Sequence, residues 1–366
     1  MRLSALAVII LAAAFGPSAA ELQVQRVTTS GAPNCSTCDI VLRKVFTLSD
    51  VGDSTAIETR HAPVHDSRGR FFFQSAQGMN GVMVFDSTGR FLSRLGRLGS
   101  GPGEFGGLGF STIVGRGDTI FVCGATKCQV FSPALKYVRS FSTVPGSARP
   151  AAVVMSNGDI AFRMWSENSA LSRNPIHLFT TEGRLVRSFG TEVPFPPNCG
   201  RCVGNAGLGL SLNKSNVWIA QAGRYELNLW DSDGKLLRQI RVQNSPWYTP
   251  SDPANLQAVP MSSITRLIED PSGILFVFGT AAKQIGPATL PPGANVSRQT
   301  AVSTPMNVAR TPQVEAIDVK TGAVLASRAI PGFVASTYGG DYLTSSRDGG
   351  GSIQYIDVWK VQLLRR

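Results

Sequence analysis

Six cysteines are the residues of this chain whose type and spacing point most directly to a definite chemistry. They form three close pairs: Cys35 with Cys38, Cys123 with Cys128, and Cys199 with Cys202. In an oxidising compartment such pairs form local disulfides, while the two CxxC pairs together also have the ligands of a four-cysteine zinc site. No helical pattern follows either CxxC pair, as a dithiol redox centre requires, and no histidine follows as in covalent haem attachment. We therefore predict three local disulfides, with a shared zinc site as the alternative.

Histidines and carboxylates give no local catalytic motif. The chain has only three histidines, His61, His65 and His177. Several carboxylates lie in turn sequences, where such groups commonly accept backbone hydrogen bonds: Asp66, Asp118, Asp159 and Asp270. There is no GxSxG elbow, HExxH pair or glycine-rich phosphate loop. The sequence predicts no catalytic residues, no metal ligands and no cofactor, and it favours a non-catalytic role without deciding against an enzyme.

The elements that must position these residues form a repeat. A Gly, Asn or Asp turn leading into a short apolar strand occurs six times: RGRFFF from Arg68, RGDTIFV from Arg116, NGDIAF from Asn157, KSNVWIA from Lys214, SGILFV from Ser272 and GGDYL from Gly339. After most copies comes a second hairpin, such as VMVFDSTGRFLSRLG from Val82, with glycine at its turn. Two hairpins make one four-stranded sheet. A period of roughly 40 to 60 residues built of strands and turns is typical of a β-propeller.

The repeat predicts an all-β, six-bladed β-propeller, with two stacked β-sandwiches as the alternative. In the sixth unit the segment from Ile353 to Leu363 supplies one strand and no second one follows. An apolar segment from Asp39 to Leu48 precedes the first repeat and belongs to no blade of its own. Because an unpaired blade edge favours aggregation, we predict that this N-terminal strand pairs with the C-terminal strand and closes the ring.

The first twenty residues have the pattern of a secretory signal. Arg2 precedes an apolar run, and the small residues Ser18 and Ala20 lie where a signal peptidase would recognise them. No later segment is long and apolar enough for a transmembrane helix. We predict a signal peptide at 1–20 and a mature chain that is periplasmic or secreted.

Composition supports one folded domain. The hydrophobic content of 43% is sufficient for a core, and the repeats extend almost end to end, so we predict a single propeller at 21–366 with its core at 35–363. The segment at about 280–312 is rich in Ala, Pro and Thr and is predicted to be an irregular insertion, either a partner-binding loop or a tolerated one. Removal of Arg2 with the signal lowers the formal charge from +11 to +10. The basic residues are dispersed, which argues against nucleic-acid binding, and the mature chain is expected to be a monomer.

The segment from Gly81 to Phe110 resembles the NHL-type repeat, in which a strand pair ends in a GxGPGEF loop before the next blade begins. The segment CSTCDIVLRKVFTLSD also resembles the start of exported bacterial six-bladed propellers. The resemblance implies a structural role for this loop. Gly101 and Gly103 would permit its backbone turn and Glu104 would cap nearby amides.

The resemblance also implies two enzyme types as comparisons. Amidating lyases of this kind hold a metal with histidines from different blades, and His61, His65 and His177 are not expected to converge. Lactonase-type propellers hold calcium with carboxylates near the axis. Arg149, Ser262 and Arg266 lie in or beside predicted inner strands and are our candidates for contact with an anionic ligand. The sequence favours an exported binding or scaffold module for a protein, peptide or surface glycan. A hydrolase or lyase dependent on calcium or another divalent metal is the alternative.

Overall fold

The computed structural model describes residues 24–51, 57, 62–75, 81–105, 110–124, 127–143, 151–163, 174–190, 207–211, 213–221, 223–249, 262–284, 308–333, 340–348 and 354–366. The predicted signal peptide, His61, Arg149, Cys199 and Cys202 lie outside these residues. Apart from one short 3-10 turn at Arg116–Asp118, the described elements are all β-strands.

Five groups of four consecutive strands form antiparallel sheets, which we call blades 1 to 5. Their strands, from innermost to outermost, are as follows: blade 1, β3 (Val64–His65), β4 (Phe71–Gln74), β5 (Val82–Phe85) and β6 (Phe91–Leu95); blade 2, β9 (Ser111–Val114), β10 (Ile120–Cys123), β11 (Lys127–Phe131) and β12 (Tyr137–Ser142); blade 3, β13 (Ala151–Val154), β14 (Ile160–Arg163), β15 (Ile176–Phe179) and β16 (Leu185–Phe189); blade 4, β17 (Leu208–Leu210), β18 (Asn216–Ala220), β19 (Glu226–Asp231) and β20 (Leu236–Gln243); blade 5, β21 (Ser263–Glu269), β22 (Ile274–Gln284), β23 (Val308–Asp318) and β24 (Val324–Ala329). A further short pair, β7 (Arg97–Leu98) with β8 (Glu104–Phe105), lies between blades 1 and 2.

A sixth sheet joins the two ends of the chain. It contains β25 (Tyr342–Asp348), β26 (Gln354–Arg365) and the N-terminal strand β2 (Cys38–Val51), in the order β2-β26-β25. The predicted pairing of the N-terminal strand with the C-terminal strand is present, antiparallel from Cys38 opposite Arg365 to Val51 opposite Gln354. Phe46 of β2 packs against Gly89 of blade 1 in the way that Phe141 of blade 2 packs against Gly183 of blade 3. The strand β2 therefore occupies an outer-strand position.

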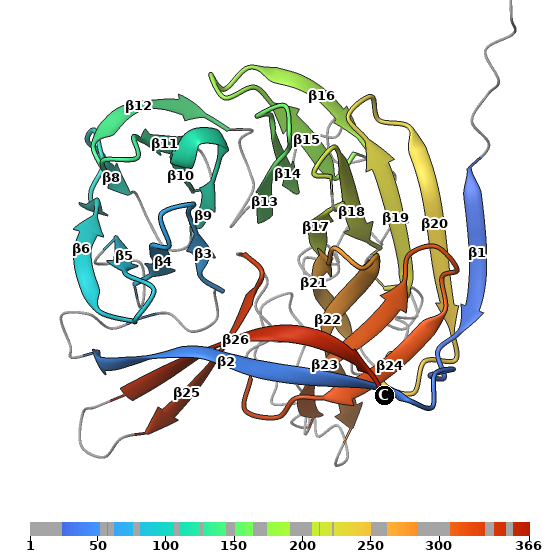
Figure 1. Cartoon of the computed structure of the whole chain (residues 1–366). Coiled ribbons are helices and arrows are strands. Elements are labelled where there is room, and N and C mark those ends of the chain that lie inside the picture. The colour runs from blue at the N-terminus through green and yellow to red at the C-terminus, as the bar shows by residue number, and fades with distance from the viewer. Residues whose placement is uncertain are drawn as a thin grey trace, which may run out of the picture.

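The sheets are arranged around a common centre (Figure 1). The innermost strands β3, β9, β13, β17 and β21 contact one another in chain order, and β17 also pairs with β21 in parallel at Leu208 and Arg266. Six hydrophobic clusters lie between neighbouring sheets, and one of these clusters lies between the sixth sheet and blade 1. The chain therefore has an all-β, β-propeller-like fold.

An additional N-terminal strand that the sequence analysis did not predict extends blade 4. Strand β1 (Gln25–Ser30) pairs in parallel with the outer edge of β20, from Gln25 opposite Arg238 to Ser30 opposite Gln243. The chain then passes along blade 5, where the amide of Asn34 donates to the carbonyl of Val324 at 2.9 Å. Figure 1 shows β1 on the outside of β20. The N-terminal segment therefore covers the outer edges of blades 4 and 5 before it enters the sixth sheet.

Arginines on outer strands connect each blade to the next one. The guanidinium of Arg139 on β12 donates to the Thr181 carbonyl in the last turn of blade 3, and Arg187 on β16 donates to the Asp233 carbonyl in the same turn of blade 4. Two further outer-strand arginines make comparable bonds to backbone carbonyls, Arg238 to Lys320 and Arg328 to Ile40. Arg70, in the first turn of blade 1, makes such a bond to Pro133 of blade 2. Part of the dispersed basic charge therefore has a structural role between blades.

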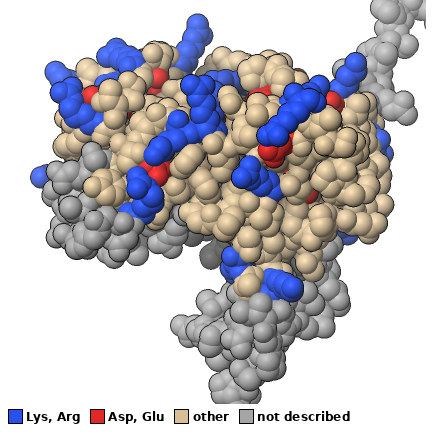
Figure 2. All heavy atoms as spheres, turned by 60° about the horizontal axis from the view of Figure 1, so that its bottom comes forward, with Lys and Arg blue, Asp and Glu red and all other residues tan. Residues whose placement is uncertain are grey.

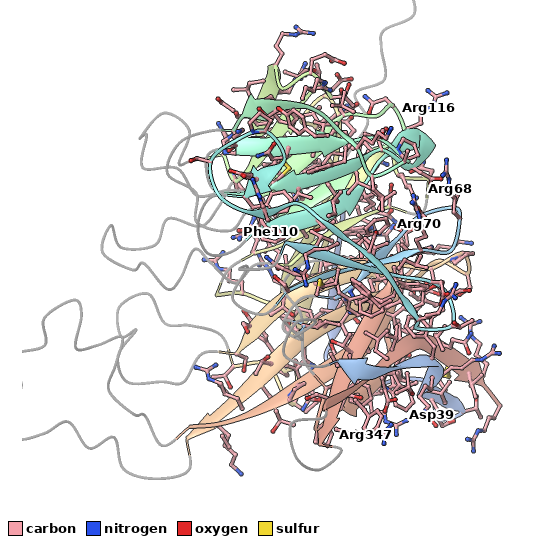
Figure 3. All side chains as sticks on the ribbon, turned by 90° about the vertical axis from the view of Figure 1, so that its left-hand side faces the viewer. Asp39, Arg68, Arg70, Phe110, Arg116 and Arg347 are labelled. Atoms are coloured by element: carbon pink, nitrogen blue, oxygen red, sulfur yellow. A yellow bond between two sulfur atoms is a disulfide. The ribbon has the colours of Figure 1, made fainter. Side chains whose placement is uncertain are left out.

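The two sides of the molecule differ in the turns that they carry. The first and third turns of each blade, with Arg68 and Arg116 among them, lie on one side, which we call the turn side (Figure 3). We call the opposite side the loop side; the described parts of two connections between blades, 96–105 and 244–249, belong to it. Side-chain oxygens of the turn aspartates accept backbone amides on the turn side, as predicted: Asp66 from Arg68 and Arg70, Asp118 from Ser67, and Asp270 from Ser272 and Ile274. Asp159 instead accepts from the Asn157 side chain.

The predicted insertion at about 280–312 is partly regular. Strands β22 and β23 continue into both ends of this range, and Thr280 to Gln284 pair with Pro312 to Val308. At both ends of the range the hairpin is therefore longer than the apolar pattern indicates. The remainder, 285–307, lies outside the described residues.

Two of the predicted disulfides are present, Cys35–Cys38 and Cys123–Cys128. The second joins β10 to β11, where the two cysteines lie opposite each other in the sheet. No helix among the described residues is long and apolar enough to cross a membrane.

Candidate functional site

A buried polar side chain recurs at one position of the third strand. In each sheet this residue lies two positions before a β-bulge in the pairing with the outer strand. Blade 1 has a methionine there, and the other sheets have polar residues, giving the series Met83, Gln129, His177, Asn228, Glu315 and Asp357. All six side chains are buried. Because burying a polar group without a partner is costly, each of the five polar residues needs a hydrogen-bonding role.

Most of these residues bond to the outer-strand residue directly opposite. His177 Nδ1 lies 2.8 Å from Ser188 Oγ, and Asn228 Oδ1 accepts from Gln239 Nε2 at 3.1 Å. Asp357 Oδ1 accepts from Thr47 Oγ1 at 2.5 Å. Ser188, Gln239 and Thr47 are the register partners of these three residues. The pairing of the third strand with the outer strand therefore sets the position of each polar side chain. The remaining donors and acceptors of that side chain can bond to neighbouring segments.

Gln129 in blade 2 holds the connection that arrives from blade 1. Its Oε1 accepts from the Gly103 amide at 3.1 Å, and its Nε2 donates to the carbonyls of Gly101 and Glu104. Within this connection the Glu104 carboxylate accepts from the Gly101 amide at 2.9 Å and forms an ion pair with Arg97 at 2.6 Å. Two hydrogen bonds lower the pKa of Glu104. The larger effect comes from the backbone amide of Gly101 and the next from the side chain of Arg97.

The loop glycines have different roles. Gly103 has φ of +74°, the left-handed conformation that favours glycine. Gly101 does not have a positive φ. A side chain there would approach Glu104 Oε2 to 3.0 Å. The turn that the sequence assigned to both glycines therefore depends on backbone freedom at Gly103 and on space at Gly101, and Glu104 caps the Gly101 amide.

Glu315 in blade 5 holds the connection that leaves blade 4. One carboxyl oxygen accepts from Trp247 Nε1 at 2.7 Å and the other from the Tyr225 hydroxyl. Trp247 follows β20, so this carboxyl group fixes the start of the next inter-blade connection. Burial raises the pKa of Glu315 to about 7, although hydrogen bonds from Tyr225, Trp247 and Ser327 act in the opposite direction. Burial, with the nearby Glu315 charge, also raises the pKa of Tyr225.

Asn228 in blade 4 belongs to a wider polar network that faces blade 3. Its neighbour along the strand, Glu226, accepts from Arg241 Nη2 at 2.8 Å and from Gln239 Nε2 at 2.9 Å. Asn228 and Glu226 share their sheet face with Trp230, which packs in the cluster between blades 3 and 4. These side chains are buried, so the network stabilises the packing of blade 4 against blade 3.

Asp357 in the sixth sheet is the centre of a charged group. Arg347 Nε donates to it at 2.7 Å, and Lys44 Nζ lies 3.5 Å away. Burial alone would raise the pKa of Asp357, but the hydrogen bonds from Arg347 and Thr47 and the charge of Lys44 hold it below its ordinary value. Arg347 also lies over the ring of Tyr355, and it projects from the lower part of the molecule in Figure 3. This group connects β2, β25 and β26.

His177 in blade 3 differs because its Nε2 is buried with no hydrogen-bond partner among the described residues. Burial lowers the pKa of His177 to about 4, so the ring is neutral at physiological pH. His65, at the end of β3, is exposed, stacks against Phe71 and makes an edge-to-face contact with Tyr342. Within the described ranges, no three His, Cys, Asp or Glu residues are close enough to hold a metal ion.

The predicted ligand contacts Ser262 and Arg266 make internal hydrogen bonds. Ser262 Oγ donates to the Trp247 carbonyl at 3.1 Å and accepts from the Thr249 amide at 3.1 Å. Arg266 Nη1 donates to the carbonyls of Gly340 and Tyr342, and its guanidinium lies 4.7 Å from the centre of the Phe278 ring. Burial lowers the pKa of Arg266 to about 10.

Neither residue presents a group to solvent, since both side chains are buried. Arg266 instead ties blade 5 to the residues that precede β25. The structure thus places Ser262 and Arg266 in separate structural contacts and does not bring them together. Their use as ligand contacts remains a prediction, as does that of Arg149.

The sequence analysis missed the recurrent polar position, although the sequence contains a signal for it. Aligned third strands read VMVF, CQVF, IHLF, LNLW, VEAI and IDVW, with a polar residue in the second place of five. An apolar strand flanked on both sides by packed neighbours has no reason to keep a polar residue at one repeat position. The pattern predicts a buried hydrogen-bonding group, but its partners come from other strands and cannot be identified from the strand alone.

No protein-family model and no curated protein sequence matches the chain. Among solved structures, a protein of Bacteroides fragilis whose name describes it as exported is similar to this chain, with a TM-score of 0.58 and 11% identity, over 93% of this chain and 100% of that chain. Virginiamycin B lyase from Staphylococcus aureus has a TM-score of 0.46 and 11% identity, over 88% of this chain and 99% of that one. A gluconolactonase from Xanthomonas campestris has a TM-score of 0.46 and 13% identity, over 88% of this chain and 90% of that one. The similarity to the Bacteroides fragilis protein is one of fold alone at 11% identity and carries no conclusion about activity.

Proposed function

We propose that this chain is an exported, six-bladed β-propeller that acts as a binding module for a protein, peptide or surface glycan on its loop side. The observation that carries the proposal is the use of the buried polar position. Gln129 and Glu315 each hydrogen-bond to an inter-blade connection of the loop side. Fixed connections on a rigid scaffold are what a recognition surface needs, because less conformational entropy is lost on binding.

Six blades and a closed ring are supported by the equivalence of β2 with the outer strands of blades 1 to 5. Thr47 stands opposite Asp357 as Gln239 stands opposite Asn228. The contact of Phe46 with Gly89 repeats a contact found between other blades. The NHL-type assignment of the repeat belongs to the same proposal and rests on the segment from Gly81 to Phe110.

Export is supported by two kinds of observation. Disulfides persist in oxidising compartments and are rare in the cytosol, and the structure has two of them. The similar protein of Bacteroides fragilis is described as exported. Cleavage after Ala20 would be measured by mass spectrometry of the protein secreted from a bacterial host, with the first mature residue expected at Glu21.

The binding role would be tested with the purified mature protein on an array of bacterial surface glycans and on a peptide array. Gln129→Leu removes the anchor of one loop-side connection, whereas Arg116→Ala removes an exposed side chain from the turn side. We expect the first variant to weaken binding of the selected ligand at least about tenfold while circular dichroism stays unchanged, and the second to bind normally. Equal loss in both variants would place binding elsewhere. A stoichiometric divalent metal in the native mass, lost on denaturation, would instead favour the metal-dependent enzyme.

A further inference from the structure

We propose that the outer edges of blades 2 and 3 are docking sites for an extended, acidic segment of a partner protein, which adds as a fifth, parallel strand. This goes beyond the proposed loop-side binding, because it concerns the rim of the propeller. The structure contains an occupied example of such a site, β1 on the edge of blade 4. Addition of a strand to an exposed sheet edge is a general mode of peptide recognition.

The edges of blades 2 and 3 are open along β12 and β16. Among the described residues, no strand pairs with the outer side of either one, and Figure 1 shows both strands on the outside of the molecule. Val138 on β12 is 56% exposed and Val186 on β16 is 44% exposed. Unpaired backbone groups next to exposed apolar side chains are the features that favour strand addition.

The outer strands of blades 2, 3 and 4 each have an arginine at the same register position. Arg139, Arg187 and Arg238 each stand opposite the third-strand residue that directly follows the buried polar position, just before the bulge. Each one uses a terminal nitrogen to bond the last turn of the following blade. Arg238 uses its other terminal nitrogen to hold the Gln25 side chain of β1. Arg139 and Arg187 therefore place, at open edges, the same kind of group that holds the added strand in blade 4, although Arg187 Nη2 also lies 3.8 Å from Asp233 Oδ1 in an exposed ion pair.

Charge selects the kind of strand that these edges accept. The segments 136–142 and 184–189 contain Lys136, Arg139, Arg184 and Arg187 and no acidic residue. Like charges on facing strands are destabilising, so pairing between the same edges of two copies is unfavourable. On the face shown in Figure 2, Lys and Arg side chains outnumber the acidic ones, which form small patches between them. A carboxylate in place of Gln25 would form a charge-assisted bond with the arginine, so an acidic strand fits better than a neutral one.

The probe is a fluorescent peptide derived from β1, Val-Glu-Thr-Val-Thr-Thr-Ser, in which Glu takes the place of Gln25 and Thr that of Arg26. Binding to the full mature protein would be followed by fluorescence anisotropy. A peptide with Lys in place of Glu is the charge control. Peptides that are N-methylated at alternate residues, in each of the two phases, test whether backbone hydrogen bonds are needed. We expect the Glu peptide to bind at least about tenfold more tightly than the Lys peptide, with one N-methylated phase not binding.

Two sets of variants locate the site on the protein. Val138→Glu and Val186→Glu place an acidic group at each open edge and together should weaken binding at least about tenfold. Leu364→Glu makes the same kind of change at a side chain that is 42% exposed on β26 and should leave binding unchanged. The double variant Arg139→Gln and Arg187→Gln tests the arginines directly.

Several results would overturn the proposal. Equal binding of both N-methylated phases would mean that charge alone attracts the peptide, and undetectable binding of the Glu peptide would mean that the basic edges serve only to prevent pairing. A dimer in the native mass that Val138→Glu and Val186→Glu dissolve would assign the edges to a second copy. Binding to vesicles of anionic lipid that these substitutions abolish, without peptide binding, would assign them to a membrane surface.

Discussion

Replacement of Glu315 by glutamine gives the sharpest test of the buried polar position. Glu315 is fully buried, and its carboxyl oxygens accept from Trp247 Nε1 and from the Tyr225 hydroxyl. Glutamine can keep both contacts, because its oxygen accepts from the indole and its amide can donate to the phenol oxygen. The variant therefore removes the titration of this site with little change in shape.

The size and sign of the expected effect follow from the pKa. Burial raises the pKa of Glu315 from 4.5 to about 7. Between these values the folded protein binds a proton that the unfolded chain releases, so the free energy of unfolding falls as the pH rises. The contribution is fully present below pH 4.5 and is lost as the pH rises through about 7. Over that window wild type should lose about 3 kcal/mol relative to Glu315→Gln.

The measurement is urea unfolding of wild type and variant at a series of pH values from about 4 to about 8. A comparison of the two proteins is required, because the lowered pKa of His177 acts in the opposite sense, with stability lost as the pH falls from 6.5 towards about 4. Asp233→Asn is the control, since its side chain is 83% exposed. If the difference between wild type and Glu315→Gln does not change with pH, Glu315 does not titrate in this window and the account of its burial is wrong.

Three further changes test the connections between and within blades. Gly234 and Gly273 both have φ of +77°, but a side chain at Gly234 would meet Phe189 Cβ at 2.9 Å, whereas nothing lies within 4 Å at Gly273. In thermal unfolding Gly234→Ala should therefore cost about 1 kcal/mol more than Gly273→Ala. Arg238→Ala removes the hydrogen bond to Gln25 of β1 and should speed hydrogen exchange of the Val27 and Thr29 amides. Unchanged exchange would show that the arginine does not hold the strand. Serine at both Cys123 and Cys128 removes a disulfide of sequence separation 5. The free energy of unfolding, measured in urea, should fall by about 2 kcal/mol. An unchanged value would show that the hairpin alone fixes this turn.

The strands could be predicted because the signal for them is local. A glycine tolerant of positive φ marks the last turn of several blades, as at Gly183 and Gly234, and the flanking apolar residues form the strands that the sequence indicates. The strand β1 could not be predicted, because Gln25–Ser30 has one apolar residue and is mostly exposed. Its pairing depends on an available edge and on Arg238, and both lie more than two hundred residues away in the chain.

The interpretation of charged and polar residues was harder for the same reason. Arg139 and Arg187 resemble solvated surface charges in the sequence, yet each one bonds a backbone carbonyl of the following blade. Arg266 was predicted as a ligand contact from its position on an inner strand, and the structure shows it buried and bonded to carbonyls. A guanidinium provides five donors, so the identity of the acceptors decides its role, and they come from other blades.

The distribution of polar groups bears on the choice between a binding module and an enzyme. In a propeller enzyme the polar side chains that act on substrate are expected to converge from several blades. Among the described residues the recurrent buried polar side chains lie on third strands and hydrogen-bond to outer strands and connections. Such a pattern stabilises the positions of loops. The same segment at the N-terminus covers the edges of blades 4 and 5 and leaves those of blades 2 and 3 open, so the rim is itself asymmetric. An architecture that fixes its connections and exposes part of its rim is suited to holding other macromolecules, and the peptide and array experiments separate its two surfaces.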